Sequence, residues 1–239
     1  MSRPKEIYEG LRAAERINTE LWYARIWDDT KKDISWLQQL PGISPGRMAV
    51  GYNYIYVMTR ILNEMHPSKV LDLGLGISST LISSYFNSLD RNPDAVHTII
   101  EHDSDWIDFY TRNRSLSSKS RIMHMPCITK EYNGCKFDAY DGFKESLSGF
   151  KYSVISVDAP LGSDDKYSRR DILDIIPQCL DEDFVIVFDD VNRTGEKNTI
   201  TDIESCLKTN GIVYYKAIYF GLTDICVIAS KNNRFFCSL

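Results

Sequence analysis

Acidic side chains stand at the ends of several short apolar segments of this chain, where β-strands are expected to end. They are Asp72, Glu101, Asp158, Asp189 and Asp190. The carboxyl ends of parallel strands meet at one edge of an α/β sheet, and ligands bind along that edge. We therefore expect these five carboxylates to converge on one site.

Three of these carboxylates are candidate metal ligands. Asp158, Asp189 and Asp190 would repel one another at adjoining strand ends, and each would raise the pKa of its neighbours. Mg²⁺ or another divalent cation would remove this conflict, because it takes carboxylate and water oxygens as ligands. Such an ion could bind a substrate hydroxyl and favour its ionised form. We predict Asp158 and Asp189 as the catalytic residues of this site.

A glycine-containing turn between the strand at 69–73 and the next helix is a candidate cofactor site. Glycines let a ligand approach the backbone, and hydroxyl side chains at a helix start can donate hydrogen bonds. A nicotinamide dinucleotide would require a third glycine where this chain has Ser79. The residues assigned to the cofactor site are Asp72, Gly74, Gly76, Ser78 and Thr80, together with Glu101 for ribose hydroxyls.

Helices and strands alternate along most of the chain, which predicts an α/β fold. We expect parallel strands at 69–73, 97–101, 121–127, 152–158 and 184–189, with helices between most of them. Two further strands, 212–219 and 224–230, are separated by a turn that permits only an antiparallel hairpin. The expected architecture is a Rossmann-like, doubly wound, mostly parallel seven-stranded sheet with a C-terminal antiparallel hairpin.

An N-terminal helical extension precedes this sheet. Residues 5–38 have apolar and aromatic positions at helical spacing, and two Pro-Gly pairs in 41–46 end the helix. We divide the chain into a helical cover, 1–45, and a ligand-binding domain, 46–239. The aromatic residues of the cover could pack in a core, roof the site or form a homodimer surface; they are Trp22, Tyr23, Trp27 and Trp36.

Composition restricts the partners and the compartment. The 239 residues carry 28 basic and 33 acidic side chains, a net charge of −5, without a Lys/Arg-rich run. We therefore expect neither a nucleic-acid partner nor a membrane partner, and the apolar runs are too short to cross a bilayer. With no apolar signal segment at the N-terminus, a cytoplasmic location with six reduced cysteines and no zinc site is expected.

The Asp-x-Gly-x-Gly turn at 72–76, the acid at Glu101 and the closing hairpin resemble the class I S-adenosylmethionine-dependent methyltransferases. The resemblance covers roughly residues 46–230, and its short motifs are specific only in combination. It implies that S-adenosylmethionine binds with its methionine end near Asp72 and Gly74 and its ribose near Glu101. It also implies that 46–239 is a methyltransferase domain.

A second resemblance lies just upstream of the turn. The segment Met48-Ala-Val50-Gly51 is similar to one that covers the cofactor in catechol and caffeoyl-coenzyme A O-methyltransferases. By this resemblance Met48, Val50 and Gly51 line the cofactor site.

This chain also resembles the catechol and caffeoyl-coenzyme A O-methyltransferases at the positions of their metal ligands. Asp158, Asp189 and Asp190 fall on those ligands, although Asp190 stands where these enzymes have asparagine. Leu161 stands where they have a lysine general base, which leaves the base of this chain open.

A third resemblance is to the glucuronoxylan 4-O-methyltransferase-like family. It rests on Gly-Leu-Gly at 74–76, the acid-x-Asp-x-x-Trp segment at 101–106, Val-Asp-Ala-Pro-x-Gly at 157–162 and the following Arg169 or Arg170. This resemblance favours a sugar hydroxyl over a catechol. It implies that Asp158 acts as a base or orients the hydroxyl without a metal.

The hypothesis from sequence is an O-methyltransferase that uses S-adenosylmethionine to methylate a hydroxyl of a small molecule or carbohydrate, with Mg²⁺ or another divalent cation left open. Two alternatives also stay open: a nicotinamide-dependent oxidoreductase, and a non-catalytic ligand-binding module of the same fold.

Overall fold

A seven-stranded sheet lies at the centre of the computed structural model, which describes residues 3–40, 42–43, 49–89, 91–162 and 166–239. Its strands are β1 (Lys69–Leu73), β2 (Val96–Glu101), β3 (Ser120–His124), β6 (Tyr152–Val157), β7 (Leu180–Phe188), β8 (Tyr214–Tyr219) and β9 (Ile225–Ser230). Their order is β3-β2-β1-β6-β7-β9-β8, and β9 runs antiparallel to both of its neighbours. The other pairings are parallel. The Rossmann-like sheet with a C-terminal hairpin expected from the sequence is confirmed.

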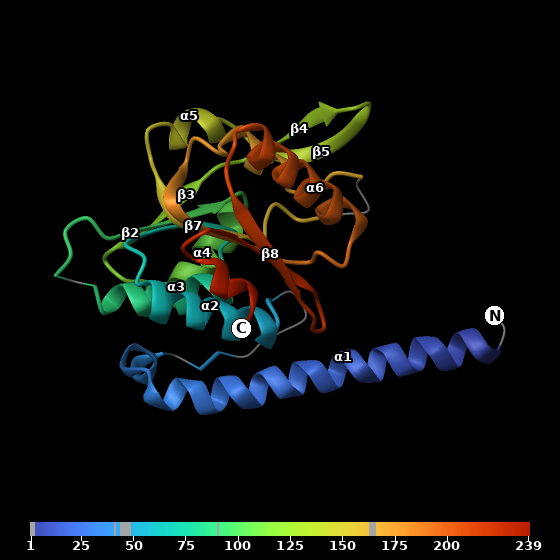
Figure 1. Cartoon of the computed structure of the whole chain (residues 1–239). Coiled ribbons are helices and arrows are strands. Elements are labelled where there is room, and N and C mark those ends of the chain that lie inside the picture. The colour runs from blue at the N-terminus through green and yellow to red at the C-terminus, as the bar shows by residue number, and fades with distance from the viewer. Residues whose placement is uncertain (1–2, 41, 44–48, 90, 163–165) are drawn as a thin grey trace.

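Helices cover both faces of this sheet (Figure 1). They are α1 (Arg3–Thr30), α2 (Tyr52–Met65), α3 (Ile77–Asn87), α4 (Ser104–Asn113), α5 (Phe143–Leu147) and α6 (Thr194–Thr209), with the 3₁₀ turns η1 (Lys31–Asp33), η2 (Ser35–Gln39), η3 (Arg170–Asp174) and η4 (Arg234–Cys237). The apolar residues of α2, α3 and α4 pack on one face, and those of α5, η3 and α6 pack on the other. The two layers bury the strands on both faces, as in other parallel sheets.

Successive side chains of β1 point to opposite faces of the sheet, which decides the helical layer that each one packs against. Val70 packs with the α2 and α3 residues, whereas Leu71 and Leu73 pack with the η3 and α6 residues. Because side chains alternate along a strand, Asp72 shares the face of Val70 and points toward α2 and α3. This placement decides the environment of Asp72 described below.

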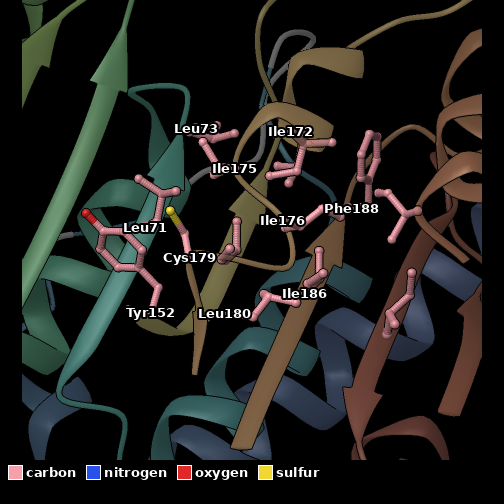
Figure 2. Close-up of a cluster of buried hydrophobic side chains, with 14 of the residues drawn as sticks. Leu71, Leu73, Tyr152, Ile172, Ile175, Ile176, Cys179, Leu180, Ile186 and Phe188 are labelled. Atoms are coloured by element: carbon pink, nitrogen blue, oxygen red, sulfur yellow. The ribbon is translucent and has the colours of Figure 1, made fainter. Parts of the chain in front are cut away.

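An irregular segment containing η3 replaces a helix between β6 and β7. Figure 2 shows its isoleucines, Ile172, Ile175 and Ile176, against Ile186 and Phe188 of β7. All five side chains are at most 2% exposed. The packing of these isoleucines fixes the residues just before them, among which is Arg169.

The helix predicted over 5–38 is shorter in the structure. It ends at Thr30, and Ile34 has extended backbone angles between η1 and η2. The Thr30 hydroxyl donates to the Ile26 carbonyl, an interaction that competes with helix continuation. No helix within the described ranges is long and apolar enough to cross a bilayer.

The strand predicted over 121–127 is also wrong in its second half. β3 ends at His124, and Pro126 separates it from β4 (Cys127–Tyr132), since proline has no N–H for a sheet ladder. β4 pairs with β5 (Cys135–Tyr140) in a separate hairpin that the sequence analysis did not predict.

Candidate functional site

The glycine turn between β1 and α3 has a backbone that a larger residue would not adopt. Gly74 has a φ of +107°, and a Cβ there would lie 3.0 Å from the Ala159 Cβ. The turn is therefore held close to the segment after β6. At Gly76, which precedes α3, a Cβ would meet nothing within 4 Å, so this glycine faces open space.

A cavity of about 560 Å³ opens beside this turn. Its wall is formed by the turn, by α4 and by the segment after β6. The predicted site residues that line it are Val50, Gly74, Gly76, Ser78, Glu101 and Asp158. Met48 lies outside the described residues.

Asp72, predicted as a cofactor-binding residue, is not among the described residues that line the cavity. The side chain is fully buried behind the turn, on the α2 and α3 face. Its Oδ2 accepts a hydrogen bond from Ser79 Oγ at 2.6 Å, and its Oδ1 accepts one from Ser156 Oγ at 2.7 Å. Ser79 Oγ also accepts from the Gly76 N–H, so Asp72 fixes the turn from behind.

Gly51 and Thr80 are also turned away from the cavity in the described structure. Gly51 precedes α2, where its Cα lies against Asn53 and Glu20. The Thr80 hydroxyl forms a 2.6 Å hydrogen bond with the Tyr110 hydroxyl, which in turn donates to the Gly76 carbonyl. Thr80 thus supports the turn through Tyr110 instead of facing a ligand.

Glu101 lies at the end of β2 with its carboxylate directed at the turn. Its Oε2 accepts from the Leu75 N–H at 2.9 Å, and its Oε1 accepts from the N–H groups of His102 and Asp103. Burial alone would raise the pKa of Glu101, but the His102 imidazole and these N–H groups lower it below its ordinary value. The carboxylate is therefore ionised, and Oε2 keeps lone-pair capacity beside the cavity.

Aromatic residues on α4 form a wall that the sequence analysis did not assign to the site. Trp106 and Phe109 stack with ring centroids 5.5 Å apart, and both line the cavity. Trp106 Nε1 donates to the Leu75 carbonyl at 2.6 Å, which ties the wall to the glycine turn. The spacing of Trp106, Phe109 and Tyr110 along one helical face is the signal that could have indicated this wall.

Three carboxylates gather around the Arg169 guanidinium, and one of them, Asp158, lines the cavity. One oxygen each of Asp158, Asp189 and Asp190 lies within 4.8 Å of the others. Arg169 Nη2 lies 2.9 Å from Asp190 Oδ2 and 3.3 Å from Asp158 Oδ1, while Nη1 donates to the Asp189 carbonyl at 3.1 Å. Arg193 adds a second cation, 2.8 Å from Asp190 Oδ2.

The Arg169 side chain is 2% exposed, and its residue has a φ of +56°. Nε donates to the Pro160 carbonyl at 3.2 Å, so the arginine also holds the segment that follows Asp158. Desolvation works against the charged guanidinium, but the Asp158 and Asp190 carboxylates raise the pKa of Arg169 above its ordinary value. Arg169 is therefore a buried cation.

The carboxylates of this cluster differ in their protonation behaviour. Burial, followed by the Asp189 charge, raises the pKa of Asp158 well above its ordinary value, and Arg169 opposes this shift. Burial and the adjacent Asp190 raise the pKa of Asp189 to about 6. Asp189 Oδ1 accepts from the Asp190 N–H and the Thr223 hydroxyl, which turns it inward. Asp158, with a side chain 26% exposed, is the carboxylate that faces the cavity.

A divalent cation fits this cluster poorly. The three carboxylates are as close together as the sequence analysis expected, but a metal ion between them would lie beside the Arg169 guanidinium, a like charge. The oxygens nearest each other already accept hydrogen bonds or pair with Arg169 and Arg193. The guanidinium thus supplies the positive charge for which a metal was predicted.

Comparisons with known proteins give fold similarity only. No family model matches the chain, and no curated protein matches it. A SAH-bound methyltransferase of Podospora anserina is 11% identical with a TM-score of 0.46, covering 97% of each chain. A precorrin-6y C5,15-methyltransferase of Geobacter metallireducens is 13% identical with a TM-score of 0.47, covering 79% of this chain and 93% of its own.

A spermidine synthase of Thermotoga maritima is similar to the same degree. It is 16% identical with a TM-score of 0.46, covering 75% of this chain and 59% of its own. Similar folds thus occur in proteins whose names state different reactions. Identities and TM-scores at this level do not establish a family for the chain.

Proposed function

We propose that this protein is an S-adenosylmethionine-dependent methyltransferase that methylates a hydroxyl group of a small molecule or carbohydrate, with Arg169 in place of a divalent cation. One observation carries the proposal. A single cavity is lined by the glycine turn, by the ionised Glu101 and by Asp158, which pairs with Arg169. The turn and Glu101 suit a cofactor, and Asp158 suits a reacting hydroxyl.

The turn favours a cationic nucleoside over a dinucleotide. The N–H groups of Leu75 and Gly76 are already bonded, to Glu101 and Ser79 respectively, and so do not point at a diphosphate. The Glu101 carboxylate would also repel such an anion. S-adenosylmethionine has no phosphate, and its ribose hydroxyls can donate to Glu101 Oε2. The Trp106 and Phe109 rings offer an apolar surface for its adenine.

Asp158 is assigned to the acceptor hydroxyl. When bound, S-adenosylmethionine supplies an electrophilic sulfonium methyl group. Burial raises the pKa of Asp158 well above its ordinary value, which makes the ionised carboxylate a better acceptor for a hydroxyl proton. The Arg169 charge favours the ionised form of Asp158, and the Asp189 charge opposes it by raising the pKa of Asp158, so Asp189 is a positioning residue.

Titration calorimetry with S-adenosylmethionine, S-adenosylhomocysteine and NADH tests the cofactor. We expect both S-adenosyl compounds to bind the folded protein and NADH not to bind. Gly76→Val should abolish this binding while the protein stays folded, because the added side chain enters open cavity space. Gly42→Val is the control, because Gly42 also meets nothing within 4 Å and is not among the described residues that line the cavity. Binding of NADH alone would refute the proposal.

A further inference from the structure

Helix α1 carries a buried carboxylate that is not among the described residues lining the cavity. This residue, Glu20, is 7% exposed. Its Oε1 accepts a hydrogen bond from the Tyr52 N–H at 2.5 Å, and its Oε2 accepts one from the Leu222 N–H at 3.3 Å. Such backbone donors satisfy a buried carboxylate in the place of water. One side chain of α1 thus binds the start of α2 and the loop between β8 and β9, which are far apart in the sequence.

Glu20 serves as the missing N-terminal cap of α2. The helix begins after Gly51, which has no side chain to accept from the first N–H groups of the helix. The Glu20 carboxylate accepts from the first of them, at Tyr52, and a negatively charged group is favourable beside the N-terminal end of a helix. The two residues before Gly51, Ala49 and Val50, line the cavity. Glu20 therefore fixes the backbone at the point where the cavity wall joins α2.

The loop between β8 and β9 connects Glu20 to the carboxylate cluster. Arg16, one helical turn before Glu20, holds the same loop by donating to the Gly221 carbonyl at 2.9 Å. Thr223 of this loop donates its hydroxyl to Asp189 Oδ1 at 3.1 Å. Helix α1 therefore holds the loop that provides a hydrogen bond to Asp189.

Two glycines allow α2 and the loop to approach Glu20 closely. A Cβ on Gly51 would lie 3.0 Å from Glu20 Oε1 and 2.7 Å from Asn53 Oδ1. A Cβ on Gly221 would lie 2.9 Å from Glu20 Oε2 and 2.6 Å from Asn53 Nδ2. The fully buried Asn53 amide also donates to the Thr223 carbonyl at 2.8 Å. The two glycines thus leave the space that Glu20 and Asn53 occupy, and the three segments form one packed junction.

We propose that Glu20 is a positioning residue of the active site, which fixes the cavity wall at Val50 and, through the loop that carries Thr223, the orientation of Asp189. The inference rests on the methyltransferase function proposed above. Both effects pass through the backbone and require no contact between Glu20 and a ligand. Helix α1 then contributes to the reaction although none of its described residues lines the cavity.

Glu20→Gln tests the role at nearly constant side-chain volume. The amide has one acceptor oxygen where the carboxylate has two, so the N–H of either Tyr52 or Leu222 loses its acceptor. We expect the Kd for S-adenosylhomocysteine in calorimetry to rise about 10-fold and kcat to fall by about the same factor, as for the loss of a hydrogen bond to a charged group. Partial unfolding alone would lower the number of binding sites without changing the Kd of the folded molecules. Glu15→Gln, the same change at an exposed position of α1, is the matched control and should alter neither value.

Hydrogen exchange followed by NMR tests the two hydrogen bonds of Glu20 without a ligand. In Glu20→Gln, the amide proton of Tyr52 or of Leu222 should exchange about 10-fold faster than in the wild type, because one of them has lost its acceptor. Thr223→Val tests the connection to Asp189, since it removes the hydroxyl and retains the shape of the side chain. It should lower kcat and leave the Kd for S-adenosylhomocysteine unchanged. Circular dichroism melting checks that each variant is folded.

The results separate this positioning role from the proposed function. A wild type that binds neither S-adenosyl compound overturns the proposed function, and the positioning role falls with it. Wild-type binding that Glu20→Gln leaves unchanged overturns the positioning role alone. Equal effects of Glu20→Gln and Glu15→Gln, or unchanged exchange at both N–H groups, also overturn it. If Glu20→Gln does not fold, Thr223→Val decides, and an unchanged kcat in that variant overturns the role.

Discussion

Replacement of Arg169 by methionine removes the buried cation that three carboxylates share. In the wild type, the guanidinium lies within 3.3 Å of Asp158 and 2.9 Å of Asp190, and its side chain is 2% exposed. Methionine retains much of the volume but leaves these carboxylates with only the half-exposed Arg193 as a cation. Loss of one partner from such a buried group costs about 3–5 kcal/mol of unfolding free energy when the carboxylates are ionised.

The loss of unfolding free energy caused by Arg169→Met depends on pH, because the carboxylates around Arg169 can take up protons. Without Arg169, the pKa values of Asp158 and Asp189 rise further in the folded state, while those in the unfolded chain stay near 4. The folded variant therefore holds protons that the unfolded chain releases, and its stability falls as pH rises through the folded pKa values. At about pH 5 the carboxylates can protonate, so the loss should shrink to about 1–2 kcal/mol.

Urea unfolding monitored by Trp fluorescence at about pH 5 and pH 8 measures both losses. Arg170→Met is the matched control, because Arg170 pairs with the single, partly exposed carboxylate of Asp202 at 3.1 Å. Its loss should be smaller and nearly the same at the two pH values. An equal loss at both pH values for Arg169→Met would refute the view that this guanidinium neutralises the cluster.

Three further outcomes can be measured. Asp158→Asn should lower kcat about 10²–10⁴-fold and leave S-adenosylhomocysteine affinity in calorimetry nearly unchanged, since Asp158 is assigned to the acceptor hydroxyl; an equal loss of affinity would contradict that role. Methyl transfer by the wild type, followed by release of S-adenosylhomocysteine, should persist after chelation with EDTA; loss of activity that Mg²⁺ restores would contradict the metal-free proposal. Burial and nearby Asp174 raise the pKa of Asp171 to about 7, and the Tyr140 N–H opposes this shift in part. The stabilisation that Asp171 contributes to the folded state is therefore complete below about pH 4 and is lost as pH rises through about 7. In urea titrations between about pH 4 and pH 7, this loss amounts to about 1.4 kcal/mol of unfolding free energy per pH unit, and Asp171→Asn should reduce it. An unchanged dependence on pH would show that Asp171 is not the source of the loss.

The sheet and part of the cavity wall could be predicted from the sequence because they rest on local patterns. Apolar runs identify parallel strands, and an acid at the end of such a run reaches the ligand edge whatever the rest of the chain does. Glu101 and Asp158 follow this rule and do line the cavity. The β4–β5 hairpin could also have been predicted, because Asn133-Gly134 is a strong hairpin-turn signal. In the structure both residues have positive φ, as that turn requires.

Arg169 could not be placed in the same way. It lies in an irregular segment, its φ is +56°, and its contacts with Asp158 and Asp190 depend on how η3 packs on the sheet. Neither spacing nor periodicity describes such a contact. Two adjacent arginines, Arg169 and Arg170, look equivalent in the sequence, and the fold alone sends one into the carboxylate cluster and the other to Asp202.

The five predicted carboxylates do converge on one edge of the sheet, yet they differ in how the protein compensates their charge. Asp72 is compensated by the hydroxyls of Ser79 and Ser156, which leave it no contact with the cavity among the described residues. Glu101 is compensated by N–H groups that keep it ionised, as a ribose acceptor should be. Asp158 is compensated only in part by Arg169, and its pKa stays high. Proton transfer requires a carboxylate of this last kind, because complete compensation would remove its basicity. The same acidic edge therefore separates into a support for the turn, a ligand for a cofactor and a base for a substrate.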